Sequence, residues 1–144
     1  MIPHQLKRLV EQQSGSVHRV SRTAVESALN ELQVPLDSEF AEFFFTYTIT
    51  LFRSEVSDEQ LCDVAEPTSE IVVGSRFIWD VWGVPEHFIC LTNLQGEGAY
   101  LYDRNAGGVW DFELRSREAF LAGRQQAKWG SFFEFMTWYL GEPG

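Results

Sequence analysis

Basic residues are scarce in this sequence. Eleven lysines and arginines stand against 21 aspartates and glutamates, so the formal net charge is −10. Contacts to nucleic-acid phosphates rest on Lys and Arg side chains, and the balance therefore argues against a DNA- or RNA-binding surface. It favours a cationic partner, which the negative field would steer toward the chain.

Cysteines and long apolar runs are also few. Cys62 and Cys90 do not suffice for a disulfide framework. No stretch reaches the roughly 18 apolar residues that a membrane span needs. The first residues, MIPHQLKRLVEQQ, hold no apolar run long enough for a signal peptide. We therefore expect a cytoplasmic chain with reduced thiols and no contact with a membrane.

Signatures of catalysis and metal binding are missing as well. The sequence has no nucleophile elbow, zinc-protease motif or P-loop. Gly96 and Gly98 lack the third glycine of a dinucleotide fingerprint and are expected in a turn. Strand neighbours point to opposite faces, so His87 can form neither an acid–base pair with Glu86 nor a metal site with Cys90. We predict no catalytic residue, metal or cofactor.

The composition predicts one folded domain over residues 1–144. Hydrophobic residues make up 44% and aromatic residues 15% of the chain, which argues against disorder. A chain of this length buries enough surface to form a core without disulfides or metals.

Helical periodicity is visible at both ends. In the first part of the chain we predict a short helix around Leu6, a helix from Thr23 to Leu32 with a Thr23/Glu26 capping box, and a helix that begins near Asp37. Toward the other end we predict a helix from Ser116 through Leu121 and a last helix after a Ser131/Glu134 capping box. Residues 68–79 fit a helix or a strand, and helix is favoured. Residues 47–51 alternate between apolar side chains and threonine, which predicts a strand, and a short strand is also expected around Leu61.

Three further strands are expected between Trp82 and Leu114. His87–Thr92 is apolar on both faces, as in a central strand. Ala99–Asp103 and Val109–Leu114 flank the turn RNAGG, which predicts an antiparallel hairpin. Helices followed by strands and then helices predict an α+β fold, with N-terminal helices, a mainly antiparallel central sheet covered by helices, and a C-terminal helix.

The order of several short motifs resembles the SUKH superfamily, which includes the SMI/KNR cell-wall regulators and many bacterial immunity proteins. The motifs are Val34-Pro35 with Phe43 and Phe44, Val84-Pro85 with Phe88 and Ile89, Gly96-Glu97-Gly98, Tyr102-Asp103, Gly108-Val109, and Ser131 through Phe135. The resemblance covers roughly residues 23–141. It implies an α+β fold and a non-catalytic protein that neutralises a bacterial toxin domain, often a nuclease or deaminase, by direct binding. The chain departs from the family at residues 47–50, where an Asn-Gly is usual.

Acidic residues concentrate in one quarter of the chain. Residues 37–70 hold nine acidic side chains and one basic side chain, Arg53, a net charge of −8. A solvated loop is one interpretation, and an anionic surface for a cationic toxin domain is the other. Trp138, which lies off the apolar stripe of the last helix, is a candidate anchor. The predicted partner-binding residues are Glu55, Asp58, Glu59, Asp63, Glu66, Glu70 and Trp138.

Two alternatives to an immunity protein remain. One is an intracellular scaffold or regulator of the same fold. The other is a small acidic hydrolase, which would need two carboxylates, or a histidine and a carboxylate, within hydrogen-bond reach in a cleft. The sequence is compatible with a monomer or a homodimer.

Overall fold

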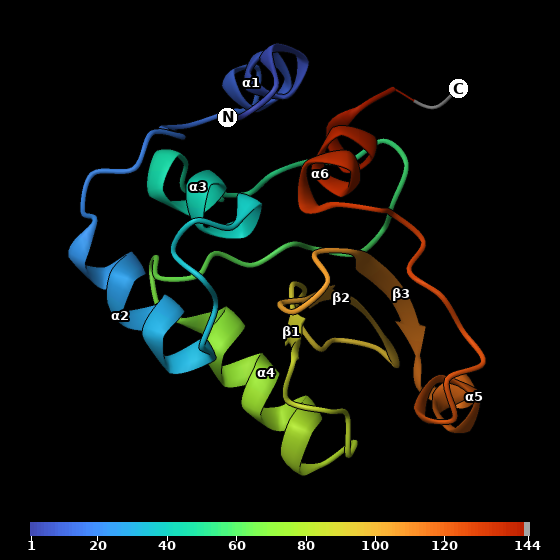
Figure 1. The fold of residues 1–144 in the computed structure, drawn as a ribbon. Coiled ribbons are helices and arrows are strands. Elements are labelled where there is room, and N and C mark those ends of the chain that lie inside the picture. Colours follow the sequence, from blue (N-terminus) through green and yellow to red (C-terminus); the bar gives the residue numbers. More distant parts are fainter. Residues whose placement is uncertain (143–144) are drawn as a thin grey trace.

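Two groups of helices enclose a small antiparallel sheet in the computed structural model, which describes residues 1–142 (Figure 1). The helices are α1 (His4–Glu11), α2 (Thr23–Leu32), α3 (Glu39–Thr46), α4 (Glu70–Asp80), α5 (Arg117–Leu121) and α6 (Phe132–Leu140), with a 3-10 turn η1 (Leu114–Ser116) before α5. The strands are β1 (Phe88–Cys90), β2 (Gly98–Asp103) and β3 (Val109–Glu113). The predicted α+β fold with a C-terminal helix is confirmed.

The sheet has the order β1-β2-β3 and is antiparallel throughout. Leu101 lies at its centre, opposite Cys90 on β1 and Trp110 on β3. The hairpin between β2 and β3 turns at residues 104–108, where Gly107 takes a left-handed φ of 89°. The predicted hairpin is therefore confirmed, although Leu114 already belongs to the 3-10 turn.

Both edges of the sheet are covered by loop segments. Beside β1, the Cys62 amide donates to the Leu91 carbonyl over 2.9 Å, and Leu61 forms an isolated bridge with Thr92. Beside β3, Val109 forms a bridge with Trp129. The strand expected around Leu61 is thus a single bridge. The expected central strand is an edge strand, and it is buried on both faces because each face of the sheet packs against a core cluster.

The two faces of the sheet pack against different helices, because side chains along a strand alternate between its faces. One face joins the larger core under α1, α2, α3 and α6 through Ile89, Tyr100, Tyr102 and Val109. The other face meets α4 and α5 through Phe88, Cys90, Leu101 and Phe112. Figure 1 shows this arrangement, with α3 and α6 on one side of the sheet and α4 and α5 on the other.

Phe132, at the start of α6, joins α3 to the sheet. Its ring centroid lies 5.3 Å from Phe40, 5.5 Å from Phe43 and 5.7 Å from Tyr102, mostly edge to face. Aromatic pairs favour such tilted geometry, which adds to the free energy gained by burying the rings. The phenylalanines of α3 and α6 therefore form one cluster rather than two separate helix stripes.

The helix starts agree only in part with the capping predictions. Ser131 caps α6 by accepting a hydrogen bond from the Glu134 amide, as predicted, whereas Glu134 bonds the Gly130 amide and not Ser131. Ser38, one residue after the predicted Asp37, caps α3. The predicted Thr23/Glu26 box is wrong.

At the start of α2 the N-cap position belongs to Arg22 instead, and the Arg22 guanidinium pairs with the Glu26 carboxylate over 3.3 Å. Residues 70–80 form α4, so the helix favoured for the ambiguous segment 68–79 is confirmed.

The strand predicted over residues 47–51 does not form. Tyr47 makes a single bridge with His18, and the Thr48 amide donates to the Val17 carbonyl over 2.7 Å. The Ile49 amide donates to the Asp63 carboxylate, and Leu51 is 81% exposed. A buried carboxylate and the Val17 carbonyl take the amides that a strand would have used, so the alternating pattern does not produce a ladder.

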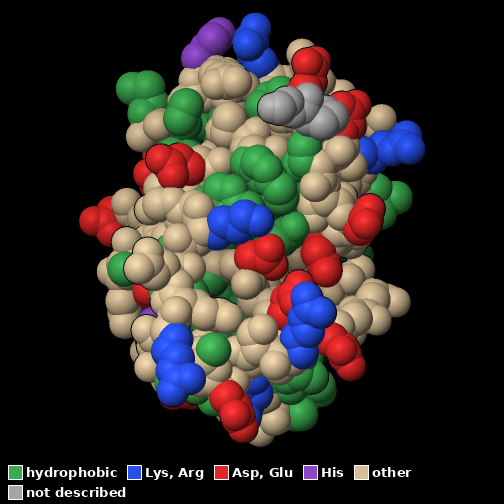
Figure 2. Space-filling model, turned by 90° about the vertical axis from the view of Figure 1, so that its right-hand side faces the viewer, with side chains coloured by type: hydrophobic (Ala, Val, Ile, Leu, Met, Phe, Trp, Pro, Cys, Tyr) green, Lys and Arg blue, Asp and Glu red, His purple; other side chains and the backbone are tan. Residues whose placement is uncertain are grey.

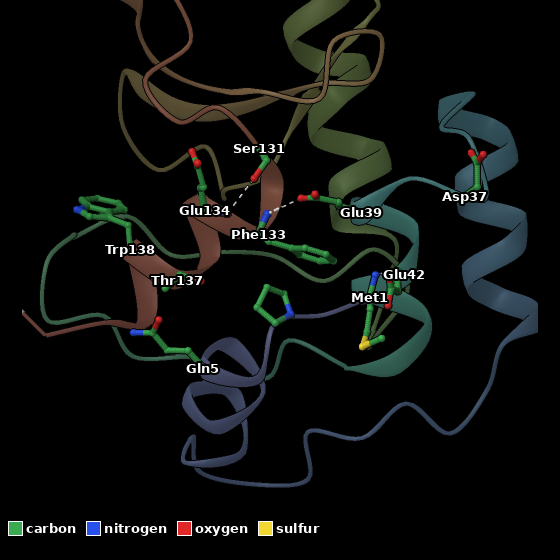
Figure 3. A pocket seen from close by; sticks show the side chains of 11 residues that line it. Met1, Gln5, Asp37, Glu39, Glu42, Ser131, Phe133, Glu134, Thr137 and Trp138 are labelled. Atoms are coloured by element: carbon green, nitrogen blue, oxygen red, sulfur yellow. Dashed lines mark hydrogen bonds and ion pairs between the residues drawn. The ribbon is translucent and has the colours of Figure 1, made fainter.

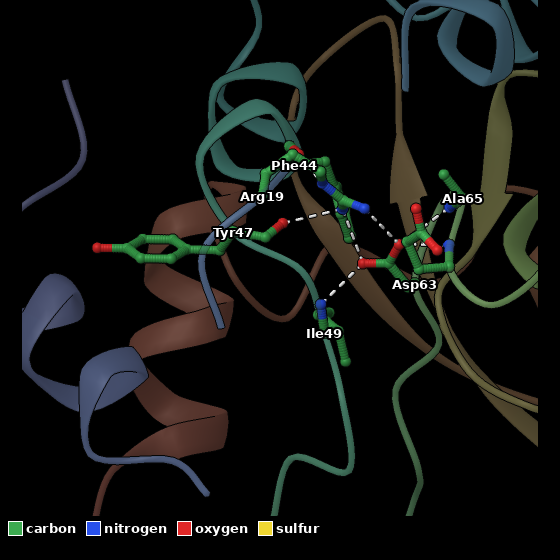
Figure 4. Close-up of polar contacts among 7 residues, drawn as sticks. Arg19, Phe44, Tyr47, Ile49, Asp63 and Ala65 are labelled. Atoms are coloured by element: carbon green, nitrogen blue, oxygen red, sulfur yellow. Dashed lines mark hydrogen bonds and ion pairs between the residues drawn. The ribbon is translucent and has the colours of Figure 1, made fainter. Parts of the chain in front are cut away.

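A buried ion pair between Arg19 and Asp63 ties this segment down (Figure 4). The side chains are 2% and 0% exposed, and two hydrogen bonds of 2.8 and 3.0 Å join the guanidinium to the carboxylate. Two further guanidinium donors reach the carbonyls of Phe44 and Tyr47. Such bidentate pairs fix the relative position of the segments that carry them.

The Asp63 carboxylate also accepts three backbone amides, those of Ile49, Ala65 and Glu66. Every oxygen of the carboxylate is therefore hydrogen-bonded inside the protein, which is the condition for keeping a buried charge.

Among the helices of residues 1–142, none is long and apolar enough to cross a membrane.

We predict that Arg19→Leu lowers the free energy of unfolding by about 3–5 kcal/mol, because it leaves the Asp63 charge buried without its counter-ion. Urea denaturation followed by tryptophan fluorescence measures the loss. Arg76→Ala is the matched control: it removes an ion pair to Glu31 of similar length, 2.8 Å, whose partners are exposed, and it should cost less than about 1 kcal/mol. Equal costs for the two variants would contradict the structural role of Arg19.

Candidate partner-binding surface

Asp63 has to be removed from the predicted partner-binding residues. It is 3% exposed and is consumed by the ion pair with Arg19 and by three backbone amides. A buried carboxylate of this kind cannot meet a partner without breaking the fold. Its place in an acidic loop made it look like a surface residue, whereas its role is structural.

The other five acidic residues divide between separate places. Glu66 and Glu70 lie exposed beside the start of α4, where a negative charge stabilises the helix through its dipole. Glu55 is exposed in the loop after α3. Asp58 and Glu59 follow in the same loop, and of the five they alone lie close to the hairpin. The structure does not bring the predicted acidic residues together as one patch.

Trp138 stands at the edge of the larger core with its side chain half-buried. Its ring centroid lies 4.7 Å from Trp129 and 6.0 Å from Tyr100. The ammonium group of Lys128 lies 5.1 Å from the Trp129 ring and 5.9 Å from the Trp138 ring. Trp138 therefore combines core packing with a surface that already attracts a cation.

Tyr100 links Trp138 to Asp58 and Glu59. Its hydroxyl lies 2.5 Å from the Ser57 hydroxyl, at the start of the acidic turn. Burial raises the pKa of Tyr100, and the nearby charges of Asp111, Glu59 and Asp58 add to the increase. The Tyr139 hydroxyl holds the same turn by donating to the Glu59 carbonyl over 2.7 Å. Trp138, Asp58 and Glu59 thus belong to one surface.

Three further carboxylates extend this surface, and the site prediction missed them. Glu97 precedes β2, and Asp111 and Glu113 point outward from β3. Glu59, Glu97 and Glu113 line a hollow of about 310 Å³. The alternation in β3 gave the outward direction of Asp111 and Glu113, but no pattern showed that the loop of residues 54–60 lies beside them.

Basic side chains on this surface are already paired. Lys128 lies 3.5 Å from Asp111, and Arg115 lies 2.6 Å from Glu113. Figure 2 views the side of the molecule on which β3, α5 and the end of α6 lie. Hydrophobic side chains reach the surface in the middle of this view, and acidic side chains surround them with individual basic side chains between. We call Trp138 with Asp58, Glu59, Glu97, Asp111 and Glu113 the Trp138 face.

Trp138 also borders an open groove of about 770 Å³ between α6, the N-terminal segment and the start of α3 (Figure 3). All charged side chains that line it are acidic, namely Asp37, Glu39, Glu42 and Glu134. Glu39 accepts a hydrogen bond from the Phe133 amide over 2.9 Å, which joins α3 to α6. Trp138 therefore lies between two acidic areas.

Neither cysteine is prepared for nucleophilic chemistry. Both thiols are free and buried. Burial raises the pKa of Cys62, and the Glu70 carboxylate adds to the increase. Burial also raises the pKa of Cys90 to about 11, against the opposing effect of Thr92. Both thiols are thus protonated at neutral pH, whereas the reactive form is the thiolate.

His87 is not brought into a catalytic or metal-binding arrangement. It lies half-buried before β1 with its ring 4.2 Å from that of Phe88, while Cys90 lies beneath α4 and its backbone amide donates to the Ser75 hydroxyl. Within residues 1–142, no three His, Cys, Asp or Glu side chains are grouped so that they could hold a metal ion.

No family model, curated protein or solved structure matches this chain.

Glu59 provides a pH-dependent test of this geometry. Burial raises the pKa of the Glu59 carboxyl, and Asp111 and Asp58 raise it further. A group whose pKa is higher in the folded state stabilises the fold at low pH, and this contribution is lost as the pH rises through the raised pKa. Glu59→Gln should therefore gain stability relative to the unmodified chain as the pH rises from about 4 to 7.

Chemical denaturation at several pH values measures this difference. A difference that stays the same across this pH range would contradict the crowding of carboxylates around Glu59.

Proposed function

We propose that the chain is a non-catalytic, protein-binding domain of the SUKH type, and more specifically an immunity protein that neutralises a bacterial toxin domain. The toxin would be a cationic domain, such as a nuclease or deaminase. The ordered motifs between Val34 and Phe135 support the family, and the net charge of −10 supports a cationic partner.

The observation that carries the proposal is that Trp138 packs against Tyr100, which feels the charges of Asp111, Glu59 and Asp58. Tryptophan is enriched among the residues that dominate the binding energy of protein interfaces. Carboxylates around such an anchor raise the association rate with a basic partner and discourage acidic ones. Masking of the toxin's active surface would then need no chemistry by this chain.

A small acidic hydrolase is the alternative that one specific observation favours, since Glu59 has a raised pKa and shares a hollow with Glu97 and Glu113. In that case Glu59 would act as a general acid. Glu59→Gln separates the two functions, because it would abolish hydrolysis and would leave most of the toxin binding intact. A scaffold or regulator of the same fold would instead bind an endogenous enzyme through the same face.

The direct experiment is co-expression with a polymorphic-toxin domain encoded immediately upstream of the gene. We expect the chain to rescue growth and to form a complex that is tighter at low salt than at high salt. Cells that die despite co-expression, with no complex recovered at low salt, would overturn the immunity function.

Variants of the Trp138 face test where the partner binds. Trp138→Ala should weaken the complex about 30-fold or more, as expected for a hot spot worth 2 kcal/mol. Asp58→Lys with Glu97→Lys should slow association at least about tenfold at low salt. Both of the latter residues are exposed, so the fold should persist.

The matched control is Glu66→Lys with Glu86→Lys, which changes the charge equally at two exposed positions outside the Trp138 face. At the same low salt it should slow association less than the test pair does, because charges far from the contact area act on the partner over a longer distance. If the control slows binding as much as the test pair, net charge rather than the Trp138 face governs recognition.

A further inference from the structure

The outward side of α4 carries a row of apolar side chains. Val73, Phe77 and Val81 follow one another at intervals of four residues and are 68%, 42% and 62% exposed. The other large apolar side chains that are exposed among residues 1–142 lie singly on other segments, namely Met1, Val20, Leu36, Leu51 and Leu121. Single exposed apolar residues are ordinary, whereas a contiguous row indicates an interaction surface.

The folding of α4 does not require this row. The helix is anchored by its other side, where Ile71, Val72 and Ile78 are buried. Valine is also a weaker helix former than alanine, lysine or glutamate, so helix propensity does not explain the two exposed valines. The Phe77 ring packs edge to face on Trp82 at 5.8 Å between centroids. A side chain that is already held in place loses less conformational entropy on binding.

One charge of each sign flanks the row. Arg76 and Asp80 lie one helical turn apart and are both exposed. Arg76 bonds Glu31 over 2.8 Å, and Asp80 makes no ion pair among residues 1–142. A guanidinium has five N–H donors, so Arg76 can bond a second carboxylate. The surface that matches this flank has the same two charges in the opposite order along the row.

A second copy of α4 that runs antiparallel has this order of charges. A two-fold axis beside Phe77 places each Phe77 ring next to the other and places Val73 opposite Val81 of the other copy. The same axis brings Asp80 to within about 3 Å of Arg76 of the other copy, measured along the helix. A two-fold interface repeats every contact, so both ion pairs form together.

We propose that the outward side of α4 is the contact surface of a homodimer, in which the rows of two copies pack antiparallel. Arg76 of each copy pairs with Asp80 of the other. The contact spans about three helical turns, so it belongs to the small interfaces of weak, reversible complexes. Because α4 and α6 lie on opposite sides of the sheet (Figure 1), the dimer leaves both Trp138 faces open and does not depend on the immunity function.

Sedimentation velocity of the full chain, from about 5 to 500 µM, tests for the dimer. Salt at about 0.15 M screens the repulsion between two chains of net charge −10. We expect a reversible change from monomer to dimer, which Phe77→Asp should weaken about 30-fold or more. Leu51→Asp is the matched control, because Leu51 is 81% exposed on another segment, and it should leave association unchanged. A chain that stays monomeric throughout, or equal effects of the two variants, would overturn the proposal.

Charge exchange tests the identity of the partner and its orientation. Arg76→Asp and Asp80→Arg should each weaken self-association about tenfold, because like charges then face each other across the two-fold axis. An equimolar mixture of the two variants should recover the affinity, since both contacts again join unlike charges. Circular dichroism checks that each variant is folded. A mixture that associates no better than the separate variants would contradict the antiparallel dimer.

Discussion

The buried ion pair between Arg19 and Asp63 is the constraint on which the arrangement of the loops depends. It joins the segment before α2 to the acidic loop, 44 residues later in the chain, and the same groups bond the carbonyls of Phe44 and Tyr47 and three further amides. Buried ion pairs offset their desolvation only when nearly every hydrogen bond is made. Here each carboxylate oxygen and most guanidinium donors are used, so the ion pair fixes the relative positions of the segments that it connects.

The ion pair has consequences for the β1 edge of the sheet and for the Trp138 face. With Asp63 fixed, Leu61 and Cys62 run along β1 and cover its open edge. The residues just before them, Asp58 and Glu59, are carried past Tyr100 toward the outward carboxylates of β3. Two of the five carboxylates of the Trp138 face, Asp58 and Glu59, thus lie in a loop that the buried ion pair holds at Asp63. The carboxylates of this face lie close together, and Asp111 and Asp58 therefore add to the increase in the pKa of Glu59 that burial causes.

Periodicity and turn chemistry were enough to predict the helices and the hairpin, because these signals are local. The Ser131 cap, the helix at residues 70–80 and the outward direction of Asp111 are all confirmed. Local signals failed where distant groups decided the outcome. The alternating residues 47–51 are not a strand because Asp63 and the Val17 carbonyl take their amides, and Asp63 itself is buried because Arg19 lies opposite. The Trp138 face is formed by residues of α6, β3 and a loop, and the pattern within one segment cannot show that distant segments lie side by side.

The central claim is that the Trp138 face is the surface that meets a partner. Hydrogen exchange of the complex with the upstream-encoded toxin domain tests it most directly, because it reports every amide without any substitution. We expect protection to rise at residues 57–59, 110–113 and 128–138 and to stay unchanged in α2. Protection that rises in α2 or α4 while these three segments stay unchanged would contradict it.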